Sequence, residues 1–389
     1  MPIKSVAIIG AGIAGLTAAL SFARYGIASD IIEQASELAE VGAGLQISPN
    51  AAHILSALDV LPLIEEKWFE PETVDLASGL SLNTLVSLPM KDVARDRWHA
   101  PYGVLHRASL QQALLAKVRH NPLCRLHLGK RLETASRTEI ARTIFTEPEL
   151  IVGADGVWSS ARYAVPNSPV ATFSRNIAWR FTLSGEDAPD FLDPTAVTAF
   201  LGPSAHVVAY PLGETGGFNI VAIAVGANPG DTWKAEAQSQ QKAFLLQQFR
   251  RWHPAFGEAL QRPTRPTFWP LFQVGVGRWH NGRDTVLIGD AAHAMMPFAA
   301  QGAAMAIEDA FELATFVSQG KTLVTSLPDF AAHRMPRIEK ARKRAALNSF
   351  AYHASGPMRI GRDLLLSMRP PEKFLADFDW LYGYRARGL

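Results

Sequence analysis

An uncharged run of 19 residues near the amino terminus, Ser5–Ala23, limits the fold more than any other segment. It is as long as a membrane span, but it contains three glycines, and only Lys4 precedes it as a basic flank. A signal peptide would begin with more positive charge and carry a small-residue cleavage site. We therefore expect a buried strand at Lys4–Ile9, a glycine turn, and a helix at Ala14–Tyr25. No other stretch of the sequence predicts a membrane span.

The turn between this strand and this helix has the spacing of a dinucleotide-binding motif. Its G-x-G-x-x-G pattern consists of Gly10, Gly12 and Gly15. The first glycine permits the tight turn, the second lets the backbone approach a pyrophosphate, and the third lets the helix pack close to the strand. The phosphates would lie at the amino terminus of the helix, beside Ala14. The alternative is a turn whose glycines serve packing alone.

A second strand, Ala28–Glu33, completes a βαβ unit of about 30 residues. Glu33 ends that strand, 18 residues after Gly15. A carboxylate at this place can accept hydrogen bonds from an adenosine ribose and would repel a 2′-phosphate. The motif therefore predicts a dinucleotide ligand, but it does not say which dinucleotide binds.

Two later strands also end in glycine and aspartate. Leu150–Gly153 is followed by Asp155 and Gly156, and Thr285–Gly289 is followed by Asp290. The carboxyl ends of the strands in such a sheet are where ligands bind. A nicotinamide dehydrogenase needs neither of these late clusters, so they favour a flavin.

A further helix begins shortly after the last of these clusters. Pro297 comes first, and Gln301 and Gly302 then open the helix Ala303–Phe316. The amino terminus of a helix at this point can stabilise negative charge on a reduced flavin ring. We therefore expect these three residues to lie at the cofactor.

The middle of the chain has a different pattern, which predicts strands at Ala171–Leu183, Ala196–Leu201, His206–Pro211 and Phe218–Ala224. We expect a helix at Ala235–Trp252 and mostly helix from Gly302 to about Ser355. The resulting fold class is α/β, with a discontinuous Rossmann-like FAD-binding domain, a mostly antiparallel sheet as the substrate domain, and C-terminal helices. The expected boundaries are 1–75, 101–170 and 276–335 for the FAD-binding domain, 76–100 and 171–275 for the substrate domain, and 336–389 for the C-terminal helical segment.

Composition excludes several classes of function. The chain has 38 Lys and Arg against 36 Asp and Glu, a net charge of +2, which argues against a nucleic-acid binder. Its single cysteine, Cys124, cannot form an internal disulfide or a cysteine-rich zinc site, and we expect it to be a small core residue. The late helical stretch contains six basic residues: Arg334, Arg337, Lys340, Arg342, Lys343 and Arg344. We expect them to form a solvated face of the helix, and the alternative is that they attract an anionic nucleotide or partner.

Three further segments, together with the motifs above, carry a family resemblance. They are His106–Leu110, Pro49-Asn50 after Gly42-Ala43-Gly44, and Asp379–Tyr384. The whole chain resembles the single-component FAD-dependent aromatic hydroxylases, or group A flavoprotein monooxygenases, such as salicylate hydroxylase, 3-hydroxybenzoate 6-hydroxylase and 6-hydroxynicotinate 3-monooxygenase. The resemblance implies that Arg107 contacts the flavin phosphates or ribityl chain. One departure is that Arg131–Glu149 is shorter than in relatives, which we interpret as a trimmed surface hairpin.

The resemblance implies a specific chemistry. NADH or NADPH would reduce FAD, which would react with O₂ to give a flavin hydroperoxide that hydroxylates a small phenolic or hydroxy-heteroaromatic acid. The implied enzyme is cytoplasmic, binds its aromatic substrate, O₂ and NAD(P)H, and has no metal, nucleic-acid or membrane partner. Whether it is a monomer or a homodimer stays open. Two alternatives are a tailoring monooxygenase for a larger phenol or quinolone, and a flavin-fold binding protein without oxygenase activity.

Candidate catalytic residues lie on one expected strand. His206 and Tyr210 are four residues apart, so they share a face of the strand about 13 Å apart. A histidine with a pKa near 6.5 suits deprotonation of a phenol, and the pair resembles one that serves the substrate in 3-hydroxybenzoate 6-hydroxylases; the alternative is a half-buried structural histidine. Arg180, Gln46 and Pro297 are candidate substrate-binding residues. For His293, beside Asp290, we expect a structural role.

Overall fold

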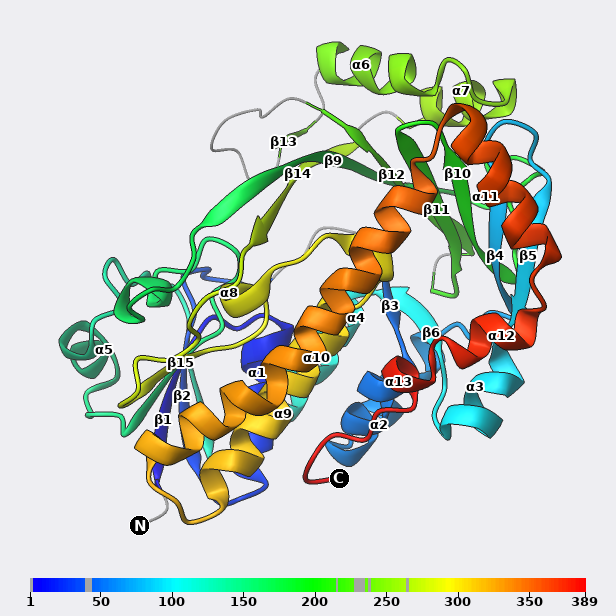
Figure 1. Cartoon of the computed structure of the whole chain (residues 1–389). Helices are drawn as coiled ribbons and strands as arrows, with labels where there is room; N and C mark the ends of the chain where they lie inside the picture. The colour runs from blue at the N-terminus through cyan, green and yellow to red at the C-terminus, as the bar shows by residue number, and fades with distance from the viewer. Residues whose placement is uncertain (1–2, 39–43, 215, 227–234, 237–238, 264–265) are drawn as a thin grey trace.

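The computed structural model describes residues 3–38, 44–214, 216–226, 235–236, 239–263 and 266–389. Two large sheets stand side by side, and one long helix runs past both of them (Figure 1). The carboxyl-terminal helices lie beside the far edge of the larger sheet. Among the residues that the structure describes, none of the helices has both the length and the apolar character needed to cross a bilayer.

The smaller of the two sheets is parallel and contains the expected βαβ unit. Its order within the described chain is β15-β8-β1-β2-β7. The strands are β1 (Ser5–Ile9), β2 (Ala28–Ile32), β7 (Cys124–His127), β8 (Leu150–Gly153) and β15 (Thr285–Leu287). Four of these strands were expected from the sequence at nearly the same bounds. Their continuous apolar character follows from burial on both faces, as in other parallel sheets.

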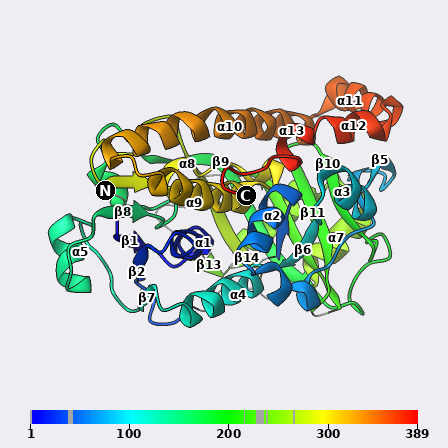
Figure 2. The same ribbon diagram turned by 90° about the horizontal axis from the view of Figure 1, so that it is seen from below.

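Helices cover this sheet in layers. The main ones are α1 (Ile13–Ala23), α4 (Arg107–His120), α9 (Gly302–Ser318) and α10 (Leu323–Tyr352). α9 packs between α1 and α10, and α4 packs on α1 (Figure 2). α9 is buried along nearly its whole length, and its buried residues are apolar except for Thr315 and the carboxylates Glu308, Asp309 and Glu312.

Shorter elements complete the chain. The helices are α2 (Pro49–Ala57), α3 (Lys91–Trp98), α5 (Arg137–Ile144), α6 (Ser239–Phe249), α7 (Pro254–Gln261), α8 (Asp290–His293), α11 (Gly356–Met368), α12 (Pro371–Ala376) and α13 (Asp379–Tyr382), with 3₁₀ helices at Leu61–Leu63, Glu65–Lys67, Ala161–Ala164 and Pro297–Ala299. A two-stranded antiparallel ribbon joins β3 (Gly44–Ile47) to β6 (Gly103–His106).

The larger sheet has the order β13-β14-β9-β12-β11-β10-β4-β5 in the described chain. Its strands are β4 (Thr73–Ser78), β5 (Thr84–Pro89), β9 (Ala171–Leu183), β10 (Ala196–Gly202), β11 (Ala205–Leu212), β12 (Gly217–Val225), β13 (Ala235–Glu236) and β14 (Thr267–Val274). All pairings are antiparallel except that of β10 with β4. The expectation of a mostly antiparallel second sheet is confirmed. The exact domain boundaries stay predictions.

The two faces of this sheet have different partners. Alternate residues, such as Trp179, Val207 and Ile220, pack under α6 and α7 with Phe249 and Trp252. The residues between them point to the opposite face, which meets the loop at Phe298 and the end of α10. The period of two along each strand therefore separates a structural face from a face that looks toward the parallel sheet.

Two expected elements are wrong in detail. The helix expected at Ala235–Trp252 is replaced by the short strand β13 and, from Ser239, by α6. The segment Arg131–Glu149, interpreted as a trimmed hairpin, contains the helix α5. Ser136 caps that helix by accepting a hydrogen bond from the Glu139 N–H, a signal that was present in the sequence.

Cys124 is half-buried at the start of β7, and its thiol lies 3.7 Å from the carbonyl of Ala19. Burial raises the pKa of the Cys124 thiol to about 11. A thiol with such a pKa is protonated at neutral pH and is a poor nucleophile, which agrees with the expected role in the core.

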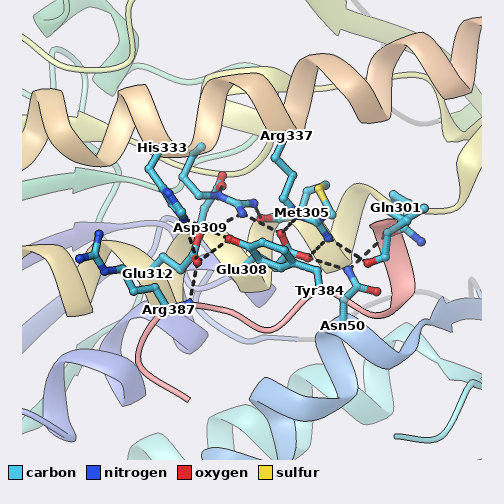
Figure 3. Close-up of polar contacts among 12 residues, drawn as sticks. Asn50, Gln301, Met305, Glu308, Asp309, Glu312, His333, Arg337, Tyr384 and Arg387 are labelled. Atoms are coloured by element: carbon cyan, nitrogen blue, oxygen red, sulfur yellow. Dashed lines mark hydrogen bonds and ion pairs between the residues drawn. The ribbon is translucent and has the colours of Figure 1, made fainter. Parts of the chain in front are cut away.

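The expected solvated basic face is wrong for Arg334 and Arg337, whereas Lys340 and Lys343 are exposed as expected. Arg334 is fully buried and contacts Glu308, Asp309 and Glu312 of α9 at 2.7, 2.8 and 3.0 Å. Arg337 binds Glu308 as well, at 2.7 Å, and stacks over the ring of Tyr384. These residues form a buried network between α9 and α10 that also holds Asn50 and the C-terminal tail (Figure 3).

The other basic residues of α10 are also mostly engaged. Lys340 lies over the ring of Trp380, and Arg344 lies over Phe378. Arg342 donates to the carbonyl of Val274. Lys343 keeps a side chain that is 77% exposed. The sequence indicated a helix that carries many basic residues, but it did not show that the side with Arg334 and Arg337 is buried where α10 crosses α9.

Removal of the Arg334 charge should strongly destabilise the fold. Arg334→Met would leave three carboxylates buried around an apolar side chain, at a cost of about 3–5 kcal/mol. Lys343→Met, on the same helix, is the matched control and should cost less than about 1 kcal/mol, because its ion pair with Glu339 is exposed. Thermal unfolding of the two holoproteins measures the difference, and equal midpoints would contradict this account.

Candidate active site

The order of the parallel sheet brings four distant motifs together. Because β15, β8, β1 and β2 are neighbours and run in the same direction, their carboxyl ends share one edge. The segments at that edge are Gly289-Asp290 after β15, Asp155-Gly156 after β8, Gly10–Gly15 after β1 and Glu33 after β2. A crevice outside the carboxyl ends is where open α/β sheets bind ligands.

The glycine turn has the geometry that its sequence predicts. Gly10 has φ +99°, and a Cβ there would lie 2.5 Å from the Ala154 carbonyl oxygen. A Cβ on Gly15 would lie 1.9 Å from the Gly10 carbonyl oxygen, because the helix packs directly on the turn. Gly12, in contrast, faces open space and begins α1 without a side-chain cap. The amino terminus of α1, beside Ala14, therefore has free N–H groups with room for a phosphate.

A second uncapped helix terminus belongs to α9. Ala300 is in the left-handed region at φ +50°, and this turn leads into Gln301 and Gly302. The buried Gln301 side chain donates to the Ser48 hydroxyl at 3.0 Å, which ties α9 to α2. A Cβ on Gly302 would meet nothing within 4 Å. Two helix N-termini with open space fit an extended anionic cofactor such as FAD.

The other expected cofactor residues lie around this edge. Glu33 accepts hydrogen bonds from the Ala11 and Ala35 N–H groups at 2.8 and 2.9 Å, so it is tied to the glycine turn itself. Asp155 accepts from the N–H groups of Ser160 and Ala161, while its other carboxylate oxygen is buried without a hydrogen-bond partner in the described chain. Arg107 begins α4 directly after β6, and Asp290 is exposed at the start of α8. Their roles toward FAD stay predictions.

His293 has the structural contacts that were expected. Its Nε2 lies 2.5 Å from Asp309, which also accepts from the Gly289 N–H and from Arg334. Burial alone would raise the pKa of the Asp309 carboxyl, but His293 and Arg334 outweigh it and lower that pKa to about 2. The ionised carboxylate therefore holds the turn after β15 in place. The residues Gly42 and Ala43 of the expected flavin-side loop lie outside the described residues.

The face of the larger sheet that looks toward the parallel sheet, called the inner face from here on, holds the expected catalytic pair. His206 and Tyr210 share that face of β11, both are buried, and Arg180 of β9 lies near Tyr210 and over the ring of Trp269. Burial raises the pKa of the Tyr210 phenol, and Arg180 opposes that rise. The expectation that the pair shares one face is met.

His206 has close neighbours that the sequence did not indicate. Its Nδ1 lies 2.9 Å from Nε2 of His353, the residue that directly follows α10. The rings of Phe298 and Tyr352 pack against it at 4.9 and 5.3 Å between centroids. Burial, and to a smaller extent His353, lowers the pKa of His206 well below its ordinary value, so the expected pKa near 6.5 is wrong.

A second group of residues joins the ribbon β3–β6 to this face. The Gly44 N–H donates to Asn219 at 2.8 Å, and a Cβ on Gly44 would lie 2.5 Å from the Tyr210 hydroxyl oxygen. Gln46 accepts from the buried Tyr102 hydroxyl at 2.7 Å. Tyr102, Asn219, Tyr352 and His353 were missed by sequence reasoning because they belong to three separate segments without a motif.

Comparison with known proteins assigns the family. A family model described as FAD binding domain matches residues 4–345, which is most of the chain. The chain belongs to this flavin-binding family. A 3-amino-4-hydroxybenzoate 2-monooxygenase of Streptomyces platensis is 31% identical, with 98% of this chain and 96% of the relative covered. A 3-hydroxybenzoate 6-hydroxylase of Aquipseudomonas alcaligenes is 30% identical, with 98% of both chains covered.

Solved structures share the fold. A salicylate hydroxylase in a substrate complex aligns with a TM-score of 0.79 at 21% identity, covering 99% of this chain and 96% of that one. Klebsiella pneumoniae HpxO, complexed with FAD and uric acid, aligns with a TM-score of 0.78 at 21% identity, covering 96% and 95%. Sequence and fold together identify an FAD-dependent aromatic monooxygenase.

The third glycine of the turn offers a test of the cofactor site. Gly15→Ala would place a Cβ against the Gly10 carbonyl, and overpacking of this kind costs about 1–3 kcal/mol. We expect FAD affinity to fall by about tenfold to a hundredfold, as measured by titration of the apoprotein with FAD. Gly257→Ala, where a Cβ meets nothing within 4 Å, is the control. Unchanged affinity in the Gly15 variant would contradict the assigned geometry.

The buried histidine pair should make stability depend on pH. Burial lowers the pKa of His353 to about 4, and that of His206 is lowered as well. The unfolded chain has histidine pKa values near 6.5, so the stability from the neutral pair is complete above pH 6.5 and is lost between pH 6.5 and 4. From pH 7 to pH 5 the loss for His353 should be about 2 kcal/mol.

The measurement is the thermal unfolding midpoint of the holoprotein against pH. His353→Gln should show a shallower decrease between pH 7 and 5 than the wild-type protein, because glutamine does not titrate. A decrease equally steep in both proteins would show that the pair does not carry this dependence.

Proposed function

We propose that this monooxygenase hydroxylates a small phenolic or hydroxy-heteroaromatic acid, of the hydroxybenzoate type, with O₂ and NADH or NADPH. The observation that carries the proposal is the inner face of the larger sheet. It carries an imidazole (His206), a phenol (Tyr210) and a guanidinium (Arg180), and His206 packs against Phe298 of the loop that leads into α9. These groups match a substrate that has one hydroxyl and one carboxylate.

The names of the relatives support this substrate class. Two proteins that align over nearly the whole chain act on 3-hydroxybenzoate and on 3-amino-4-hydroxybenzoate, which are both hydroxylated benzoic acids. Both substrates carry the two polar groups for which the inner face has partners.

Each residue of the proposed site would have a separate role in the reaction. Bound FAD, held at the termini of α1 and α9, would take electrons from the nicotinamide and activate O₂. Arg180 would bind the carboxylate, because a guanidinium pairs with it through a fork of N–H donors. His206, kept neutral by its lowered pKa, would accept the phenol proton as the ring is attacked. Pro297 and the buried Phe298 would close the flavin side and exclude water.

Turnover with a panel of acids tests the proposal. Salicylate, 3-hydroxybenzoate, 3-amino-4-hydroxybenzoate and 6-hydroxynicotinate would be given to the holoenzyme with NADH or NADPH. Hydroxylated product and peroxide would be quantified. We expect coupled turnover with at least one acid. Nucleotide oxidation that yields only peroxide with every acid would overturn the substrate class and favour a larger phenol.

Arg180→Gln tests the carboxylate contact. The variant should raise KM for the accepted acid by about tenfold to a hundredfold, since hydrogen bonds to charged groups contribute about 1.5–3 kcal/mol. KM for the corresponding phenol without a carboxylate should stay nearly the same. Arg283→Gln is the control, because its side chain is 77% exposed and pairs with Asp284 at the surface. Equal effects on acid and neutral phenol would refute the contact.

His206→Ala tests the base. The variant should keep FAD and lose about 10²–10⁴-fold in hydroxylation at neutral pH. His120→Ala, an exposed histidine on α4, should retain full activity. Normal hydroxylation with an unchanged pH profile in the His206 variant would show that another group accepts the proton.

A further inference from the structure

The base proposed above does not stand alone in the fold. Nδ1 of His206 lies 2.9 Å from Nε2 of His353, a distance at which one ring must donate and the other must accept. No other polar contact of the His206 ring is found among the described residues. Nε2 is therefore the ring nitrogen of His206 that remains for a substrate hydroxyl.

The identity of the donor decides whether His206 can act. A neutral imidazole has one N–H and one lone pair. If His206 donated through Nε2, it could not take a proton from a phenol at that atom. If His206 Nδ1–H donates to His353 Nε2, then His206 Nε2 carries the lone pair. His353 is therefore in the position to fix the tautomer on which the base depends.

The fold holds His353 at this point from several sides. Its backbone N–H donates to Ser349 as α10 ends, and its carbonyl accepts from the Ser204 N–H just before β11. Asn348, one turn earlier, donates to the Phe298 carbonyl at 2.9 Å. Phe298 also packs against both imidazole rings. The end of α10 is thereby fixed to β11 and to the loop on the flavin side.

Among the described residues, no Asp, Glu, Lys or Arg side chain contacts the His206 ring. The described titratable side chains in contact with His206 are Tyr352, the last residue of α10, and His353, which follows it. Its partners across the sheet, Leu201 and Ile223, are apolar, as is Phe298. His206 is 1% exposed, whereas His353 is partly exposed. A proton that reaches His353 is thus nearer to solvent than one on His206.

We propose that His353 is a positioning residue that accepts the Nδ1–H of His206 and leads the phenol proton toward solvent. This inference rests on the proposed function. The phenol O–H breaks as His206 Nε2–H forms, and the His206 Nδ1–H breaks as His353 Nε2–H forms. His206 stays neutral in its other tautomer, and the proton leaves from His353 to water. Protonation of the product by the reverse path restores both rings.

Two variants separate the tautomer from the proton path. His353→Leu removes both, whereas His353→Gln keeps an oxygen that can accept the His206 Nδ1–H but cannot relay a proton. With 3-hydroxybenzoate, or the acid accepted best in the panel, kcat of the leucine variant should fall by about tenfold or more at pH 7. The glutamine variant should keep a wild-type KM with a reduced kcat. His120→Gln is the control for a surface histidine.

The pH profile distinguishes this role from a structural one. Without His353 a proton taken up by His206 has no path to solvent, so turnover depends on phenol that has already lost its proton to water, and the loss should diminish as pH rises toward the pKa of a free phenol near 10. The wild-type enzyme should be nearly independent of pH across that interval. A loss in the leucine variant that is constant with pH, or no loss in either variant, would overturn the proposal.

A second measurement needs no turnover. Nitrogen NMR of histidine-labelled holoprotein without substrate, assigned with the His206 and His353 variants, reports which ring nitrogen carries the proton. We expect Nδ1–H on His206 in the wild-type protein and a tautomer mixture in His353→Leu. A wild-type His206 protonated at Nε2 would refute the inference even if the acid panel succeeds. If every acid fails while His206 carries Nδ1–H, the proposed substrate class fails and the assigned tautomer stands.

Discussion

The buried carboxylates of α9 are the interaction on which the rest of the structure depends. Asp309 holds the turn after β15 and binds His293, Glu308 binds Asn50 of α2, and Glu312 accepts from the tail at Tyr384 and Arg387 (Figure 3). Burying three carboxylates costs several kcal/mol each unless cations compensate for the lost water. Arg334 and Arg337 supply that compensation, and so α10 must cross α9 at this place.

The same crossing positions the proposed site. α10 begins beside the parallel sheet, passes over the carboxylates at Arg334, and ends at His353 against the larger sheet (Figure 1). One helix therefore connects the cofactor edge with the histidine pair. The charge network leaves α10 little freedom to slide. The same contacts that stabilise the fold therefore fix the distance between His206 and the cofactor edge, which is formed by the carboxyl ends of the parallel strands.

Much of the fold could be predicted from local pattern. The glycines of the first turn, the apolar strands and the alternating residues of the larger sheet each have a short-range physical cause, and the structure has them at nearly the expected bounds. The basic face of α10 was misjudged, because the sequence shows that arginines share a face but does not show what covers it. The pKa expected for His206 was wrong for a related reason, because burial and the neighbouring His353 lower it.

By itself the sequence determined the dinucleotide turn and the position of His206 and Tyr210 on one strand face, because both depend on spacing along a single turn or strand. It also determined the family, because the family's motifs are short segments that can be read along the chain. Tertiary structure alone decided that Arg334 faces three carboxylates and that His353 meets His206, since the partners lie 22 to 26 and 147 residues apart in the chain. Contacts at such separations depend on how the elements pack, and packing leaves no local pattern in the sequence.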